Sequence, residues 1–241
     1  MRIIDAKWEK RNLGVDCREC HVDVSDTREA IEDAIRQVED SQYLVARIPS
    51  VRIDAVQCFQ EHHYQFIEAA IKLDCDLKKA QLPPRFQSIG QMVSWEKMSD
   101  KDLDILYSEI DQNIFKTDRI ILDPFFTKKQ AADRYKFWTM DLVREGHRPY
   151  QVIYNQKVVG FFLNKEIQPG VFDGLLAGTY HEYEGSGMGI CVQYAGLEMA
   201  KQMGGKRYIG HVSGNNPAVL KTLEMIGFHI KLMEYILIKH N

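Results

Sequence analysis

The sequence lacks any long hydrophobic run and any strong excess of charge. No apolar stretch in its 241 residues approaches the ~20 that a membrane-spanning helix needs. The opening residues, MRIIDAKWEKRNLG, are charged and have no apolar core of the signal-peptide kind. A formal net charge of -3 gives no reason to expect nucleic acid or an anionic membrane as a partner. We therefore expect a cytoplasmic protein that neither inserts into a membrane nor binds nucleic acid.

Cysteine is scarce and shows no pairing pattern. There are five cysteines, an odd number without the spacing of a disulfide framework, which fits a reducing compartment. Cys17 and Cys20 form the motif CREC, and His21 follows. A structural zinc site needs four ligands, usually from two such pairs, and the other three cysteines are scattered singly. We expect no metal site here, only two thiols at the entrance of a strand.

The common nucleotide-binding fingerprints are also missing, although glycine gathers in one place. In HEYEGSGMGICVQYAG, residues 181–196, Gly185, Gly187 and Gly189 alternate ahead of an apolar pattern with helical spacing. A Rossmann loop needs G-x-G-x-x-G after the first strand, and a P-loop needs Lys and Ser or Thr after its last glycine. Neither spacing is present. Two interpretations remain: a tight strand-to-helix turn without a ligand, or a loop whose N–H groups and helix dipole bind a pyrophosphate.

What is present is an ordinary globular composition, 45% hydrophobic and 27% charged, in alternating strands and helices. Residues 1–80 predict β-α-β-α-β, including a strand in YQFIEAAIKLDCDL. KKAQLPPRFQSIGQ, residues 78–91, is the best linker candidate because of its prolines and glycine. The remainder predicts β-α-α-β-β-β-α-β-α-β, with a strand in DGLLAGTYHEY and one or two strands in FHIKLMEYILIKH. We expect an α/β (α+β) protein with a smaller domain at 1–82 and a larger one at 83–241.

Another helix follows the glycine loop one strand later. In SGNNPAVLKTLEMIGF, Asn216 is the predicted N-cap, Pro217 the first helical residue and Gly227 the C-terminal cap. By itself this pattern predicts a well-formed helix and nothing more.

Together, the loop and this helix resemble the GNAT acyltransferase superfamily. EGSGMG (184–189) resembles its Q/R-x-x-G-x-G/A loop, and residues 216–228 resemble its N-x-x-A-x-x-L-Y-x-x-x-G-F helix. WEKRNLGV, HYQFIEAAIKLDCDL and DGLLAG are similar to segments of dTDP-fucosamine acetyltransferase and related amino-sugar-nucleotide N-acetyltransferases. The resemblance implies the GNAT fold, a central mixed, mostly antiparallel sheet flanked by helices, after a truncated N-terminal α/β domain.

The resemblance implies acetyl-CoA as the acyl donor. Backbone amides of the loop would hold its pyrophosphate, and the strand before the loop would bond the pantetheine arm, with an N–H near Leu176 facing the thioester oxygen. Asn216 would contact the donor near its thiol end or serve as a plain N-cap, and the two roles can coexist. The residues assigned to the donor are Leu175, Leu176, Ala177, Gly185, Ser186, Gly187, Met188, Gly189, Ile190 and Asn216.

Two residues depart from the family pattern. Glu184 stands where the family has Arg or Gln, which puts a carboxylate near the expected pyrophosphate. The like charges repel unless the side chain turns outward. Leu223 stands at the tyrosine that commonly protonates the leaving thiolate. Another group must then give that proton, or the thiolate leaves into solvent.

Five residues are candidates for proton transfer. Glu68 lies in the apolar run FIEAAI, where a carboxylate is costly without a partner or a task, and it matches a glutamate of the resembling sugar enzymes. A solvent-facing side chain is the alternative. His181 and His211 titrate near neutral pH and suit either proton role, or are a loop residue and a satisfied strand histidine. Tyr180 and Tyr183 are the nearest stand-ins for the missing tyrosine.

The acceptor half of the function rests on the resemblance alone. Asp123, Phe125 and Phe126 are expected to line the acceptor pocket, with a packed loop as the alternative. We expect an N-acetyltransferase acting on a nucleotide-linked amino deoxy sugar in surface-polysaccharide (lipopolysaccharide O-antigen) synthesis. The alternatives are an enzyme that acetylates a peptide N-terminus or a small amine, and a non-catalytic acyl-CoA-binding protein. The tail MEYILIK offers a strand edge that could pair in a homodimer.

Overall fold

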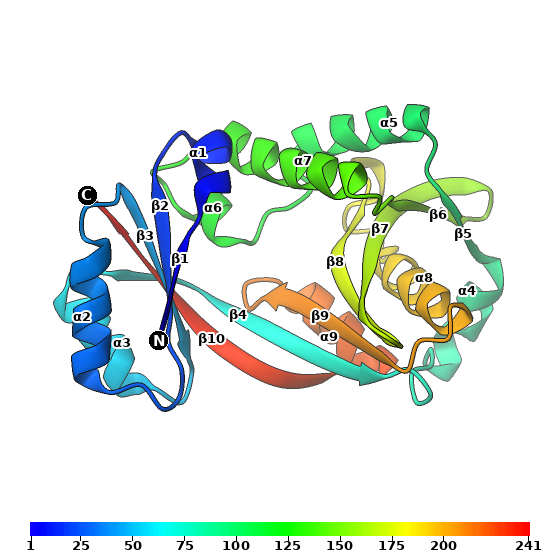
Figure 1. Ribbon diagram of the computed structural model, residues 1–241. Coiled ribbons are helices and arrows are strands. Elements are labelled where there is room, and N and C mark those ends of the chain that lie inside the picture. Colours follow the sequence, from blue (N-terminus) through cyan, green and yellow to red (C-terminus); the bar gives the residue numbers. More distant parts are fainter.

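The computed structural model describes residues 1–241 and contains one ten-stranded sheet (Figure 1). Its strand order is β1-β2-β3-β10-β4-β9-β8-β7-β6-β5. All neighbouring strands are antiparallel except the pairs β2–β3 and β8–β9. The strands are β1 (Arg2–Asp5), β2 (Cys17–His21), β3 (Tyr43–Pro49), β4 (Gln65–Asp76), β5 (Val93–Lys97), β6 (Tyr150–Tyr154), β7 (Lys157–Gln168), β8 (Val171–Thr179), β9 (Arg207–Ser213) and β10 (His229–His240).

Helices connect most of the strands. They are α1 (Lys7–Leu13), α2 (Arg28–Val38), α3 (Ile53–Glu61), α4 (Gln87–Met92), α5 (Asp100–Asp111), α6 (Arg119–Leu122), α7 (Lys128–Arg144), α8 (Gly189–Gln202) and α9 (Pro217–Ile226), with short 3-10 helices η1 (Pro84–Phe86) and η2 (His181–Tyr183). None of these helices has the length and apolar character that a membrane crossing requires.

Apolar side chains on the two faces of the sheet form separate clusters. The largest, of 21 buried residues, packs α8 and α9 against the sheet, and a cluster of nine packs α5 and α7 against the other face. Phe161 and Phe162 of β7 show the division, because these successive residues point into different clusters as strand alternation requires. A cluster of 14 residues lies beneath α2 and α3 in the N-terminal half.

Strands β4 and β10 join the two halves of the chain. β4 lies between β9 and β10, and β10 lies between β3 and β4, so each is hydrogen-bonded on both sides. The prediction that MEYILIK is a free edge is therefore wrong, because residues 234–239 are paired with β3 and Met233 is paired with β4. The edges of the sheet are β1 and β5. The domain boundary at 82/83 stays a prediction, and β4, which precedes it, is paired with strands that follow it.

The predicted fold class is confirmed: helices flank a mixed, mostly antiparallel sheet. Several local details differ from the prediction. β8 ends at Thr179 and its expected last residues form η2, and the expected linker contains η1 and most of α4, whereas the tail is a single strand, one of the two predicted possibilities. Helix α1 was not anticipated, because its seven residues are too few to show a clear period.

Candidate functional site

The parallel strands β8 and β9 separate halfway along their length. Val171–Gly174 of β8 pair with Arg207–Gly210 of β9, and the pairing stops there. Beyond that point, residues 176–179 pair only with β7, and residues 211–213 pair only with β4. Figure 1 shows the two strands diverging. The facing edges of β8 and β9 therefore carry backbone groups that no neighbouring strand satisfies, as at a sheet edge.

A β-bulge sits where the separation begins. Gly174 lies opposite Asn164 and Leu176 opposite Leu163, so Leu175 is an extra residue in β8. Gly174 is required here, because a Cβ atom on it would lie 2.6 Å from the hydroxyl oxygen of Tyr208. That hydroxyl donates a hydrogen bond to the side-chain oxygen of Asn164 on β7. The bulge is thus held by packing from both neighbouring strands, a feature that sequence alternation alone does not reveal.

The glycine loop after η2 leads directly into helix α8. Gly185 and Gly187 have φ angles of +71° and +83°, which few other residues adopt without strain. The backbone N–H groups of Gly185, Gly187 and Gly189 donate to no acceptor in the protein. Ser186 closes the turn by donating to the carbonyl of Tyr183 at 2.5 Å. Three free amides at the N-terminus of a 14-residue helix form an anion-binding arrangement.

Glu184 is neutralised by a neighbouring lysine. Its Oε1 accepts a hydrogen bond from Lys116 Nζ at 2.5 Å, and its Oε2 lies 3.6 Å from His181 Nδ1. The hydrogen bond and charge of Lys116 lower the pKa of Glu184. The carboxylate at the start of the loop is therefore compensated, which answers the repulsion expected from the sequence. His181 itself is exposed, and its backbone N–H donates to Glu109 at 2.7 Å.

Asn216 and Leu223 take the places expected of them on α9. Asn216 is confirmed as the N-cap, with its Oδ1 accepting from the Val219 amide at 3.2 Å. Its NH2 group has no partner and stays free to donate. Leu223 is buried against Gly210 of β9, so the helix offers no acid at that position. Asn216 is therefore available to bind a ligand, whereas Leu223 has a packing role.

Glu68 lies inside the protein because of a second bulge. Ile236 of β10 lies opposite Glu68 and Leu237 lies opposite Phe66, so Ile67 is the extra residue. The bulge breaks the alternation: Phe66 is 54% exposed, whereas Glu68 is 8% exposed. Burial raises the pKa of Glu68, and the charge of Asp118 adds to the effect, while the Ser213 hydroxyl and Arg119 oppose it.

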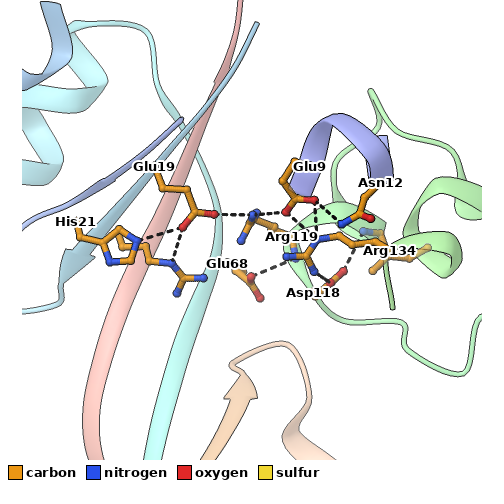
Figure 2. A network of polar contacts seen from close by, with 10 residues as sticks. Glu9, Asn12, Glu19, His21, Glu68, Asp118, Arg119 and Arg134 are labelled. Atoms are coloured by element: carbon orange, nitrogen blue, oxygen red, sulfur yellow. Dashed lines mark hydrogen bonds and ion pairs between the residues drawn. The ribbon is translucent and has the colours of Figure 1, made fainter. Parts of the chain in front are cut away.

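The surroundings of Glu68 are a buried ionic network (Figure 2). Its Oε1 accepts the backbone N–H of Arg119, at the start of α6, at 3.1 Å. The Arg119 guanidinium donates to Glu9 of α1 at 3.1 Å and to Glu19 of β2 at 2.8 Å. Arg134 of α7 donates through Nε to Glu9 at 2.9 Å. These partners leave no signal in the sequence, because they come from distant segments and no shared motif links them.

His211 lies where β8 and β9 part. Its Nε2 lies 3.2 Å from Oδ1 of Asp173 on β8, an ion-pair distance without hydrogen-bond alignment. The side chain is half-exposed, so it is accessible from the gap between the strands. Ser213, two residues on, carries the hydroxyl that faces Glu68. The end of β9 therefore carries His211 beside Asp173 and Ser213 beside Glu68.

Other predicted site residues have mainly packing contacts. Tyr180 is buried with α5 side chains, and that burial raises its pKa. Phe126 packs against Tyr43, while Asp123 accepts from His240 Nε2 at 2.8 Å. Phe125 is exposed and stacks on the His240 ring. These contacts tie the segment between α6 and α7 to β10, and the role of the segment in an acceptor pocket stays a prediction.

The CREC thiols belong to the core. Cys17 and Cys20 are buried in β2, and burial raises the pKa of both to about 12. No group of three or more His, Cys, Asp or Glu side chains is arranged to hold a metal ion.

Comparisons with known proteins agree with this geometry at the level of fold. No family model and no curated protein matches the chain. A GCN5-related N-acetyltransferase from Sphaerobacter thermophilus aligns with a TM-score of 0.59 and 14% identity over 88% of this chain and 64% of that one. This chain therefore spans less than two thirds of that protein. A conserved protein of unknown function from Staphylococcus epidermidis aligns with a TM-score of 0.65 and 12% identity, over 94% and 85% of the two chains.

A further similar structure is a glucosamine N-acetyltransferase region of a fungal multi-domain GH3 beta-N-acetylglucosaminidase. It aligns with a TM-score of 0.59 and 12% identity over 88% of this chain and 27% of that chain. Identities this low establish the fold and leave the activity to be argued from the site. With parted parallel strands, a bulged β8 and a glycine loop before α8, the chain has the fold of the GCN5-related N-acetyltransferases.

Proposed function

We propose that the protein is an acetyl-CoA-dependent N-acetyltransferase. The observation that carries the proposal is the open edge of β8, followed directly by a loop with three free backbone amides. An extended amide chain that ends in a pyrophosphate matches these two features. The amide chain needs an unpaired strand edge, and the pyrophosphate needs converging N–H donors. The similar structure from Sphaerobacter thermophilus is itself named as an N-acetyltransferase.

The residues present fit acetyl-CoA. The free amides of Gly185, Gly187 and Gly189 would hold its pyrophosphate, with Glu184 held by Lys116. The edge formed by residues 175–177 would bind the pantetheine amides, and the free NH2 group of Asn216 is a further donor. When bound, acetyl-CoA supplies an activated thioester carbonyl.

The chain's own groups can manage the protons of such a reaction. Glu68 has a raised pKa, which suits a base that must accept a proton from an amine near neutral pH. A backbone N–H near Leu176, at the bulge, would donate to the oxyanion. Because Leu223 offers no acid and Tyr180 is buried, His211 or solvent would return a proton to the sulfur.

For the acceptor, we propose the amino group of a nucleotide-linked amino sugar. Its support is the likeness of residues 8–15, 63–77 and 173–178 to amino-sugar-nucleotide enzymes, and the glucosamine N-acetyltransferase region among the similar structures. A peptide N-terminus or another small amine is the second candidate. A non-catalytic acyl-CoA-binding protein is the third, favoured by Leu223 in place of an acid.

Calorimetric titration with acetyl-CoA tests the donor site, and we expect saturable binding to the intact chain. Release of the CoA thiol, followed with DTNB against amino-sugar nucleotides, peptides and small amines, tests the acceptor. All five cysteines are buried, so the folded protein adds little thiol background. Absence of CoA binding would overturn the whole proposal. Tight binding without turnover on any amine would favour the third candidate, a non-catalytic acyl-CoA-binding protein.

A further inference from the structure

A cavity of about 290 Å³ lies between helices α1 and α7. It is lined by Trp8, Arg11, Asn12, Arg134, Trp138 and Asp141. Residues 8, 11 and 12 share one face of α1, and residues 134, 138 and 141 share one face of α7, by helical spacing. Both faces meet in one groove. No residue of the glycine loop or of the β8 edge takes part in it.

The two helices are fastened at several points, which makes the groove a formed site. Arg11 donates to both carboxylate oxygens of Asp141, at 3.1 and 2.6 Å. Glu9 accepts from Arg134 at 2.9 Å. Gln130 donates to the carbonyl of Leu13 at 3.0 Å. These contacts span the length of α1 and hold the walls of the cavity apart at a set distance.

Two of the protein's three tryptophans line this cavity, and both remain accessible. Trp8 is 47% exposed and Trp138 is 37% exposed. Indole rings have the largest apolar surface of any side chain and stack well on planar rings. Because both indole rings stay partly exposed in one groove, their apolar surface is not buried as it would be in the core. A flat, aromatic ligand would recover it.

The cavity wall carries a donor for an anion. Arg11 and Asp141 neutralise each other, and the charge of Arg134 is shared with Glu9 and Asp118, so an anion can interact only with donors that these carboxylates leave free. Glu9 lies behind Arg134, fully buried, and is shared with Arg119 and Asn12. The Nε atom of Arg134 is taken by Glu9 and its Nη1 lies 3.5 Å from Asp118, whereas its Nη2 donates to no acceptor. A donor is therefore available at the cavity.

We propose that this cavity is a second binding site, which takes a planar aromatic group carrying a negative charge, the chemistry of a nucleoside phosphate. The aromatic ring would lie against Trp8 and Trp138, and the phosphate would meet the free Nη2 of Arg134. Nothing in this inference depends on acetyl transfer, because the residues involved are separate from the donor site.

Two sources share this chemistry: a free nucleotide, or the nucleotide portion of a larger acceptor. The second source has a structural connection, because Arg134 lies 3.5 Å from Asp118, and the Asp118 charge acts on Glu68. A nucleotide that contacted Arg134 would therefore touch the same buried ionic network that holds the proposed base, since Arg134 and Arg119 both donate to Glu9 and Arg119 also donates to Glu68.

Tryptophan fluorescence, excited at the red edge of indole absorption, tests the proposal directly. We expect saturable quenching by UMP, dTMP or AMP, weaker binding of uridine, and no effect of inorganic phosphate alone. The Trp138→Leu and Trp8→Leu variants should each weaken binding about tenfold or more. Trp95→Phe, which changes the one tryptophan outside the cavity, should leave affinity unchanged. Arg11→Gln leaves the Asp141 carboxylate without its cationic partner, and this added negative charge on the wall should weaken UMP more than uridine.

The outcomes separate the possibilities. Tighter binding of dTDP-glucose than of dTMP assigns the site to the nucleotide of an acceptor, and equal binding assigns it to a free nucleotide. Circular dichroism identifies any variant that fails to fold, and Arg11→Gln then serves as the remaining test. Absence of saturable quenching by every nucleotide, or uridine binding as well as UMP, overturns the proposal. Calorimetry with acetyl-CoA on the same samples shows whether the donor site behaves independently.

Discussion

Glu68 on β4 accepts a hydrogen bond from the backbone N–H of Arg119, at the start of α6, over a distance of 3.1 Å. This contact ties the buried carboxylate to a short helix that is itself fixed by two glutamates, because the Arg119 side chain bridges Glu9 and Glu19. Glu68 therefore has a set position, and burial raises its pKa. The first two predictions follow from this arrangement.

Replacing Glu68 by Gln should lower kcat by about 10²–10⁴-fold, the usual contribution of a general base. Acetyl-CoA affinity should stay the same, since Glu68 is not among the residues assigned to the donor. Steady-state rates against pH, with calorimetry for the donor, check both statements. A Glu68→Gln enzyme with an unchanged rate and pH profile would remove Glu68 from the reaction.

The same variant should alter how stability depends on pH. Burial raises the folded-state pKa of Glu68 above its unfolded value. Its contribution is thus fully present below the unfolded pKa, about 4.3, and is lost as pH rises through the folded pKa. Urea unfolding at several pH values should show the Glu68→Gln variant gaining stability relative to wild type as pH increases. Parallel curves for the two proteins would contradict this reading.

Replacing Arg119 by Met should destabilise the fold by about 3–5 kcal/mol, because it leaves Glu9 and Glu19 buried without their shared partner. Burial favours the neutral form of Glu19, but the charges of Arg119 and Arg47 and the contact with His21 outweigh it and lower its pKa. The stability from Glu19 is therefore present above its unfolded pKa and lost as pH falls. Adding Glu19→Gln to Arg119→Met should recover part of the loss in denaturant unfolding.

Alanine substitutions at Gly187 and Gly189 form a test variant and its matched control within the loop. Gly187→Ala forces a φ of +83° on a residue with a Cβ atom, which costs about 1–2 kcal/mol or shifts the loop amides. We expect weaker acetyl-CoA binding. Gly189→Ala adds a methyl group in open space without positive φ, and should keep both stability and affinity. Equal donor affinity for the two variants, measured by calorimetry, would argue against the loop as the pyrophosphate site.

Lys116 should matter for the donor through Glu184 alone. Lys116→Ala releases the Glu184 carboxylate beside the loop, and we expect acetyl-CoA affinity to fall several-fold, more so at low salt. The double variant Lys116→Ala/Glu184→Gln should restore it, because the repelling charge is gone. If the double variant binds as weakly as Lys116→Ala, then Lys116 contacts the donor itself.

The sequence by itself determined the features that depend on near neighbours along the chain. Gly185 and Gly187 permit the positive φ angles that the loop adopts before the helix, and Asn216 with Pro217 and Gly227 favours a capped helix. Alternation and helical spacing gave the order of most elements, and so the fold class. These preferences act over a few residues, which is why they can be read without coordinates.

Tertiary structure decided what those elements surround. The bulge at Ile67 turned Glu68 inward, pairing on both sides made β10 an interior strand, and Glu184 found its partner in Lys116, 68 residues away. Arg119 contacts Glu9, which is 110 residues away in the sequence, and the cavity between α1 and α7 also joins segments that are far apart in the sequence. Such contacts depend on strand order and on where a register shifts by one residue. Neither leaves a local signature in the chain, because both arise from the packing of the whole sheet.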